Sequence, residues 1–241
     1  FQKHYQRLID NKKRYAEALG VKFFMYEYST DFKEYAKHFK ENYPFITMYN
    51  IVNKYKLALM EKLVNKYDEV LYLDFDAIPV TNENFFDVWD LSKGIAILHN
   101  NDKIRPTHYH LDAMAMLEEN GLSPQCDVVN TGIIGCNKEH WNKLNYFSDL
   151  DKSFELMHYL RSDEYKKDSM YPINITNTFG YDNETIFSYK LKKQNVPVQW
   201  LNNQWHYFYD YEMHIPKETK IVHAINKEFD YVWRYEKKIN F

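Results

Sequence analysis

Cysteine is scarce in this sequence, since its 241 residues include only Cys126 and Cys136. The two form neither a CxxC pair nor the spacing of a zinc site, so a zinc-stabilised fold is excluded. We expect two reduced, partly buried thiols, and a single disulfide between them is the alternative.

Long apolar runs and an excess of positive charge are also missing. No run approaches the roughly 20 apolar residues of a membrane helix, and the N-terminus lacks the pattern of a signal peptide. Any anchor or targeting segment would therefore lie outside this sequence. The net charge is −3, and Lys and Glu are mixed along the expected helices, whereas nucleic-acid binders usually carry a basic stripe. We therefore expect no nucleic-acid partner.

Hydrophobic residues, by contrast, are numerous enough for one large core. They make up 45% of the chain, and 18% of the residues are aromatic. No internal repeat, low-complexity stretch or Gly/Ser linker divides residues 1–241. A single domain is therefore the simplest organisation.

The hydrophobic pattern alternates between helical and extended periods in the first half of the chain. This alternation predicts an α/β fold with a mostly parallel central sheet flanked by helices. Because such folds normally open with a strand and this chain opens within a helix, we expect a first strand upstream. The expected helices span residues 2–19, 31–39, 47–67, 84–91, 138–150 and 182–195, and the expected strands span residues 21–28, 70–73, 94–98, 128–136, 196–201 and 220–224.

Asp74 and Asp76 form the most informative pair. They follow residues 70–73, an unbroken apolar run of the kind that forms a strand buried on both faces. Residues i and i+2 of an extended chain point to the same side, so both carboxylates emerge at the end of a strand, where α/β sheets bind ligands. Paired carboxylates favour Mg²⁺ or Mn²⁺, which can bridge a diphosphate. The alternative is a solvent-exposed pair that caps a turn.

His223 follows another strand-like run, and an imidazole at a strand end can complete a carboxylate metal site. Mixed oxygen and nitrogen ligands favour Mn²⁺ over Mg²⁺. The alternative is a core or surface histidine, one of 10 in the chain. Lys56, one helix before the Asp pair, is placed to reach a phosphate or a sugar, or is an ordinary solvated helix residue.

A third polar stretch follows Asp127 inside an expected strand. Gly132 permits close backbone approach by a ligand, and Asn130 offers both a donor and an acceptor. A β-bulge without a ligand is equally compatible with this pattern.

A fourth stretch, Asp182-Asn183-Glu184, stands at the start of an expected helix. Acidic and amide side chains there can bind hydroxyl groups, and one of them can serve as a catalytic base. The alternative is an N-cap followed by an acidic first turn, which the helix dipole favours. The aromatic and amide-rich residues 200–206 are a weaker indication of a sugar site.

In this order, the pieces resemble the GT-A glycosyltransferases. The most similar families are the glycogenin-like and lipopolysaccharide galactosyltransferase group, and the yeast-type galactosyl/mannosyltransferase and plant xylosyltransferase group. The matching stretches are NKKRYA followed by Gly20, KLALMEKLVNKYDEVLYLDFDAIP with its DxD motif, VNTGIIG, YDNE and IVHA. The likeness spans most of the chain, and it implies one GT-A-like, Rossmann-like domain.

The resemblance also implies a function and a set of site residues. The protein would be a metal-dependent transferase of hexose or pentose from a nucleotide-sugar, with a UDP-sugar expected, to a glycan or glycoprotein acceptor. Mn²⁺ or Mg²⁺ would be bound by Asp74, Asp76 and His223, the donor would be contacted by Phe75, Lys56, Asn130, Gly132 and Asn183, and the acceptor side with its base would be formed by Asp127, Asp182 and Glu184.

The sequence departs from the family pattern in two places. Asn183 stands where related retaining enzymes often carry Gln, and Lys227 follows His223 sooner than the family's Lys does. A glycoside hydrolase, with two carboxylates roughly 5–10 Å apart, and a non-catalytic carbohydrate-binding module are the alternative functions. The domain is expected in the cytoplasm, or in the Golgi lumen where an anchor precedes it, and the sequence predicts no particular oligomeric state.

Overall fold

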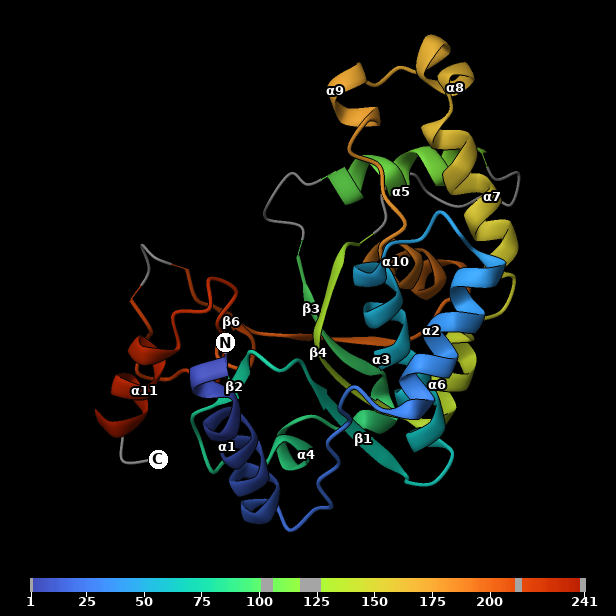
Figure 1. Cartoon of the computed structure of the whole chain (residues 1–241). Coiled ribbons are helices and arrows are strands. Elements are labelled where there is room, and N and C mark those ends of the chain that lie inside the picture. The colour runs from blue at the N-terminus through green and yellow to red at the C-terminus, as the bar shows by residue number, and fades with distance from the viewer. Residues whose placement is uncertain (1, 101–105, 118–126, 211–213, 239–241) are drawn as a thin grey trace.

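The computed structural model describes residues 2–100, 106–117, 127–210 and 214–238, which form a mixed α/β domain (Figure 1). The α/β class predicted from the sequence is confirmed, whereas Cys126 lies outside the described residues. Among the described helices, none is long and apolar enough to cross a bilayer. The helices are η1 Gln2–His4, α1 Tyr5–Ala18, α2 Thr30–Asn42, α3 Met48–Val64, α4 Phe85–Val88, η2 Leu91–Lys93, α5 Pro106–Leu117, α6 Lys138–Leu144, α7 Leu150–Arg161, α8 Asp163–Asp168, α9 Ile173–Thr176, α10 Asn183–Lys193 and α11 Phe229–Lys238.

The main sheet contains four strands in the order β1-β4-β3-β5. Of the neighbouring pairs, β3 and β5 are parallel, while β4 runs antiparallel to both β1 and β3. The expectation of a mostly parallel sheet is therefore corrected to a mixed one. An apolar run indicates that a strand is buried on both faces, but it does not indicate the direction of the strand. Parallel and antiparallel strands therefore give the same sequence pattern here. The strands are β1 Glu69–Leu73, β3 Ile95–His99, β4 Val129–Asn137 and β5 Val198–Leu201.

A second, smaller sheet joins the C-terminal part of the chain to the segment after β1. It contains β2 Ala77–Pro79, β7 Ile221–His223 and β6 Tyr207–Phe208 in the order β2-β7-β6. β7 runs antiparallel to β2 and parallel to β6. Because β2 begins three residues after Asp74, this pairing carries His223 to the carboxyl end of β1.

Helices cover the main sheet on both sides. Figure 1 shows α2, α3 and α6 on one side, while Phe85 of α4, Leu91 of η2 and Ile221 of β7 pack on the other, and α11 packs on the small sheet. The larger core packs α2, α3, α6, α7 and α10 against the sheet, with fully buried Ile51, Leu57 and Ile134 among its members. Each such side chain contributes roughly 1.5–3 kcal/mol on burial.

Local signals explain where several helices begin and end. Ser29 and Thr47 accept hydrogen bonds from the amides of Phe32 and Asn50, so they cap α2 and α3. The expected helix over residues 138–150 stops early, because Asn145 adopts a left-handed conformation with φ of 45°. A new helix, α7, then starts at residue 150.

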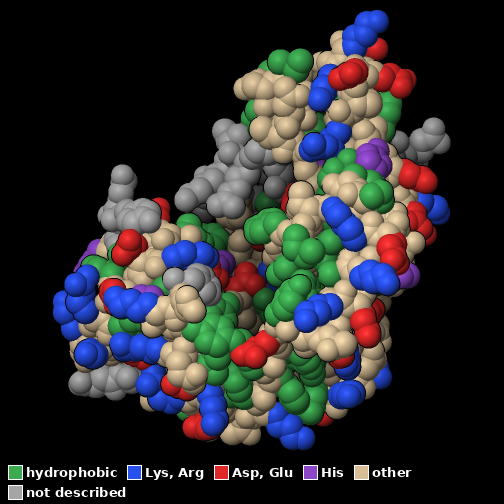
Figure 2. Space-filling view, viewed as in Figure 1, with side chains coloured by type: hydrophobic (Ala, Val, Ile, Leu, Met, Phe, Trp, Pro, Cys, Tyr) green, Lys and Arg blue, Asp and Glu red, His purple; other side chains and the backbone are tan. Residues whose placement is uncertain are grey.

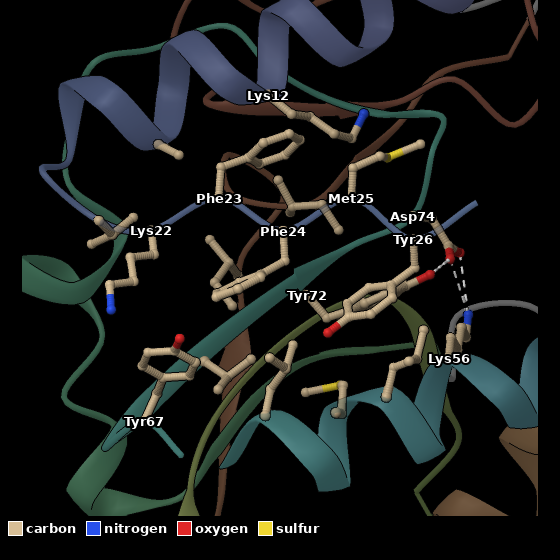
Figure 3. A pocket seen from close by; sticks show the side chains of 18 of the residues that line it. Lys12, Lys22, Phe23, Phe24, Met25, Tyr26, Lys56, Tyr67, Tyr72 and Asp74 are labelled. Atoms are coloured by element: carbon tan, nitrogen blue, oxygen red, sulfur yellow. Dashed lines mark hydrogen bonds and ion pairs between the residues drawn. The ribbon is translucent and has the colours of Figure 1, made fainter. Parts of the chain in front are cut away.

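Residues 21–28, expected to form a strand, have no regular secondary structure and pair with no strand among the described residues. They lie opposite β1, the edge strand of the main sheet, across a groove of about 950 Å³ (Figure 3). Aromatic residues favour strands only where a neighbouring backbone lies within hydrogen-bonding reach, and here the groove intervenes.

Candidate functional site

The chain turns at the end of β1, and this turn holds Asp74 and Asp76. The amide of Asp74 donates to the carbonyl of Gly132 on β4 (2.7 Å), which fixes the turn to the sheet. The β2–β7 register places Ala77 opposite His223. As a result, one carboxylate oxygen from each aspartate and one ring nitrogen of His223 lie within 4.8 Å of one another. We call these three residues the Asp–Asp–His site.

Asp76 is the more buried carboxylate of the site, with 7% of its surface exposed. His223 Nε2 lies 3.4 Å from its Oδ1, and the ammonium of Lys227 forms an ion pair with its Oδ2. Burial alone would raise the pKa of Asp76, but the hydrogen bonds and charges of His223 and Lys227 outweigh burial and hold that pKa well below its usual range. Asp76 is therefore a carboxylate at neutral pH.

Asp74 faces the groove and has a different set of partners (Figure 3). Lys56 Nζ lies 3.2 and 3.3 Å from its two oxygens, and the hydroxyl of Tyr72 donates to Oδ1 at 2.5 Å. Burial, and then the charge of Asp74, raise the pKa of Tyr72 well above its usual value, so this hydroxyl stays a donor. Lys56 therefore lies beside the Asp pair, and its contact with a phosphate or a sugar stays a prediction.

These residues fit a divalent cation. Carboxylate oxygens and an imidazole nitrogen form a donor set that suits Mn²⁺. The positive charge that balances the carboxylates comes from lysines, and an ion would take over that role. The Lys227 side chain is 47% exposed, so it can turn into solvent, whereas that of Lys56 is only 9% exposed.

Lys12 supplies a further amine near the site, buried as Lys56 is, and the sequence did not single it out. Its Nζ donates to the carbonyl of Phe75 (2.8 Å), and burial lowers its pKa to about 7, against the carboxylates of Asp76 and Asp74. The ring of Phe75 packs on Tyr5, with ring centroids 5.2 Å apart, and also lines the groove, so its contact with the donor stays a prediction. The signal that was available is the position of Lys12 on the buried face of an amphipathic helix.

A second histidine lies behind His223. His206 Nε2 is 2.9 Å from His223 Nδ1, and both rings are at least nine-tenths buried. Burial lowers the pKa of His206 well below its usual value, as does the charge of His223. Gly132 leaves the space for the His223 ring, because a Cβ at that position would come within 2.8 Å of Nδ1. The close approach at Gly132 expected from the sequence is thus made by an imidazole of the chain itself.

The polar residues predicted on β4 and at the start of α10 meet each other. Glu184 Oε1 accepts hydrogen bonds from Asn130 Nδ2 (2.9 Å), from the amide of Thr131 (2.9 Å) and from its hydroxyl (3.3 Å). Asn183 Nδ2 donates to Thr131 Oγ1 (2.7 Å). We call these four residues the amide cluster. Burial raises the pKa of Glu184, while the amide of Thr131 opposes this shift.

The remaining predicted residues have structural contacts. Asp182 caps α10, because its carboxylate accepts from the amide (2.7 Å) and hydroxyl (2.7 Å) of Thr185. Asp127 is exposed and lies 3.0 Å from His99 Nε2. Since Asp127 precedes Gly132 by five residues, roughly 16 Å of extended chain separates it from the Asp–Asp–His site. Their catalytic roles stay predictions.

The groove along β1 opens at this site. Lys12, Lys56, Asp74 and Phe75 line one end of it, and apolar residues of α3 and of residues 21–28 line its length. Figure 2 shows hydrophobic side chains gathered along the hollow of this face, with acidic side chains near its centre. An anionic ligand at the site would therefore lie next to an apolar surface.

No protein-family model matches the sequence, and no curated protein matches it. Solved structures with similarity include an active-site mutant of LgtC (14% identity, 69% of this chain and 57% of that chain, TM-score 0.38). They also include the galactosyltransferase LgtC with donor and acceptor sugar analogues (12%, 76% and 66%, 0.41) and mouse xyloside xylosyltransferase 1 in its apo form (14%, 92% and 73%, 0.41). This chain thus spans less than two thirds of the LgtC chains. At these TM-scores the similarities carry no argument about function, which rests on the site itself.

Proposed function

We propose that this protein is a metal-dependent glycosyltransferase. It moves a hexose or pentose from a nucleotide-sugar to a glycan or glycoprotein acceptor, and the proposed donor is a UDP-sugar. The supporting observation is the Asp–Asp–His site, whose three ligand atoms lie within 4.8 Å of one another at the end of β1. Oxygen ligands from two carboxylates with one imidazole suit Mn²⁺, and Mg²⁺ to a lesser degree.

A divalent ion at this site would neutralise the diphosphate of the donor and stabilise the leaving nucleotide diphosphate. The chain's own residues supply the rest of the electrostatics. Lys56 is held beside Asp74 by the buried face of α3, so it presents a fixed positive charge. Lys227 stands on a half-exposed side chain and can turn from Asp76 toward an anionic ligand. Both charges favour a diphosphate over a neutral sugar.

The acceptor side is proposed to lie around the amide cluster and Asp127. The three hydrogen bonds that Glu184 accepts support a role in positioning Asn130 and Thr131, and the capping contacts of Asp182 support a role in starting α10. Asp127, the most exposed of the three acids, is the remaining choice for a base beside the acceptor hydroxyl.

The hydrolase alternative is less compatible with this geometry. Two-carboxylate hydrolases place their carboxyl groups roughly 5–10 Å apart on either side of one bond. The ligand atoms of Asp74 and Asp76 converge within 4.8 Å, which suits one shared cation better. Sensitivity to a chelator separates the two functions, since hydrolases of that type need no metal.

The test is a thermal-shift screen of UDP-, GDP- and other nucleotide-sugars, with and without Mn²⁺. A ligand at 100 times its Kd stabilises the folded state by about 2.7 kcal/mol, so the donor should raise the midpoint only when Mn²⁺ is present. The best donor is then assayed for sugar transfer and for loss of transfer with EDTA. Absence of any Mn²⁺-dependent shift would overturn the proposal, and a shift without turnover would favour the binding module.

A further inference from the structure

His206 and His223 come together through the pairing of β6 with β7. The two strands run parallel, with Tyr207 opposite Val222 and Phe208 opposite His223, so the residue just before β6 stands beside β7. The two imidazole rings have centroids 5.1 Å apart, and His206 Nε2 lies 2.9 Å from His223 Nδ1. His206 therefore contacts the ring nitrogen of His223 that does not face Asp76.

The His223 ring is held in place by its surroundings. Gly132 lies against its Nδ1 edge so closely that any side chain there would collide with the ring. Phe208 packs on both imidazoles, with centroids 5.0 Å from His206 and 5.4 Å from His223. The ring thus keeps Nε2 toward Asp76, at 3.4 Å from Oδ1, and Nδ1 toward His206. What the packing leaves open is which nitrogen of His223 carries the proton.

A hydrogen bond between two imidazoles contains a single proton, so it has two possible directions. A neutral imidazole has one N–H and one lone pair. If His223 donates from Nδ1, its Nε2 lone pair is available to a metal ion. If His206 donates instead, neutral His223 carries its proton on Nε2 and cannot be a ligand through that atom.

We infer that His206 is a positioning residue for the metal site: it accepts a hydrogen bond from Nδ1–H of His223 and so presents the Nε2 lone pair of His223 to the cation at Asp74 and Asp76. The inference rests on the proposed metal-dependent function. It assigns a role to a residue that touches neither the ion nor the substrate. Partners of this kind orient ligating histidines and fix their tautomer in many metal proteins.

The proton count places the remaining hydrogen of His206 on Nδ1. That nitrogen is buried and has no hydrogen-bond partner among the described residues. A buried N–H without a partner is costly, so with no ion present the opposite direction is favoured, in which Nε2–H of His223 faces Asp76. A cation bound by the Nε2 lone pair of His223 requires the proposed direction, and binding of the ion offsets this cost.

Two substitutions of His206 distinguish the effect of its hydrogen-bond acceptor on metal binding from the effect of its ring size. His206→Phe keeps the ring size and removes the acceptor, and we expect it to weaken binding of Mn²⁺ alone by about 10- to 100-fold in calorimetric titration. His206→Gln carries an amide oxygen that can accept the same bond, so it should recover most of the affinity. The control is His140→Phe, because His140 is also buried and has an Nδ1 without a partner among the described residues, but its Nε2 donates to the carbonyl of Ser92 (2.9 Å). That control should leave Mn²⁺ affinity within about twofold of wild type.

A second measurement uses the wild-type chain and does not depend on how the variants fold. Nitrogen-15 NMR of histidine-labelled protein, with diamagnetic Mg²⁺ added, should show the His223 proton on Nδ1 and coupled to the His206 ring. The inference is overturned if the proton lies on Nε2, or if His206→Phe is folded and binds Mn²⁺ as wild type does. If wild type itself binds no Mn²⁺, the proposed function fails first, and the inference fails with it.

Discussion

The Asp–Asp–His site and the amide cluster are both built from acids at strand and helix ends, but different groups hold their carboxylates. In the first, the partners of Asp74 and Asp76 are ammonium groups at the ends of lysine side chains. In the second, Glu184 is bonded to a backbone amide, a hydroxyl and a side-chain amide on the adjacent strand. The ammonium of Lys227 can be exchanged for another cation, whereas Lys56 is held beside Asp74, and the partners of Glu184 cannot leave without opening the fold. We therefore expect cation binding at the first cluster and, at the second, contacts that hold Asn130 and Thr131 in place.

The largest expected effect is on metal binding, from Asp76→Asn. The amide keeps the shape of the side chain but removes the charge, so we expect Mn²⁺ affinity to fall by at least about 100-fold with the fold retained. Calorimetric titration with Mn²⁺, together with thermal unfolding, measures both quantities. Asp31→Asn, in the exposed first turn of α2, is the matched control and should bind as wild type does. Unchanged affinity in Asp76→Asn would remove the distinction between the two clusters.

Glu184→Gln should have the opposite effect, because it should lower the stability of the fold and leave Mn²⁺ affinity unchanged. The amide oxygen of Gln can still accept the bonds from Asn130 and Thr131, but it carries no charge, so these bonds weaken, and we expect this to cost about 1–3 kcal/mol of stability. Urea unfolding measures the loss, and Mn²⁺ affinity should stay within about twofold of wild type. A variant of wild-type stability that had lost sugar transfer would move Glu184 from architecture to catalysis.

Much of the Asp–Asp–His site was readable from the sequence because its signals are local. An apolar run followed by Asp74 and Asp76 predicts a strand end with two carboxylates, and another run precedes His223. What could not be read depends on pairing between distant segments. Lys12 and His206 enter the site only through the packing of α1 and of β6, and neither residue type in isolation indicates a metal site.

The fold shows the same division. The expected helices begin within a few residues of helices in the structure, because periodicity and caps are local signals, whereas α5, α7, α8, α9 and α11 were not expected. Strand direction does not follow, because β4 has the same apolar run in either direction. Residues 21–28 have strand-like composition, yet whether they join a ladder depends on what lies beside β1, which their own pattern does not contain.

The dependence of stability on pH tests the surroundings of the amide cluster, because Lys54 is a buried titratable group that contacts the residue just before the α10 cap. This lysine is fully buried on α3, donates to the carbonyl of Tyr181 (2.5 Å), and burial lowers its pKa to about 8, against the opposing charge of Asp182. Between pH 8 and the unfolded value near 10.5, folded Lys54 loses its proton while unfolded Lys54 keeps it, so stability should rise with pH. The expected gain is about 2 kcal/mol from pH 8 to pH 10.

The control for this measurement is Lys54→Met, which removes the titrating group and should remove that part of the rise. Urea unfolding at several pH values gives both curves, and subtraction cancels the other groups that titrate in the range. Parallel curves for wild type and variant would show that Lys54 keeps its charge in the folded state. A carboxylate at the start of α10 would then balance the charge of Lys54. The surroundings of the amide cluster would in that case pair an ammonium group with a carboxylate, as the Asp–Asp–His site does.

The smallest expected effect sharpens the comparison most directly, since it tests whether the lysine partners are exchangeable. Lys227→Met removes the ammonium that competes for Asp76, so Mn²⁺ should bind more tightly. Exposed ion pairs are worth about 0–1 kcal/mol, which corresponds to a gain of up to about fivefold in affinity. Lys220→Met, which breaks an ion pair with Glu83 away from the site, is the control and should change nothing. Weaker binding in Lys227→Met would mean that the lysine shapes the site rather than competing for it, and Asp76 would then have a fixed partner as Glu184 does.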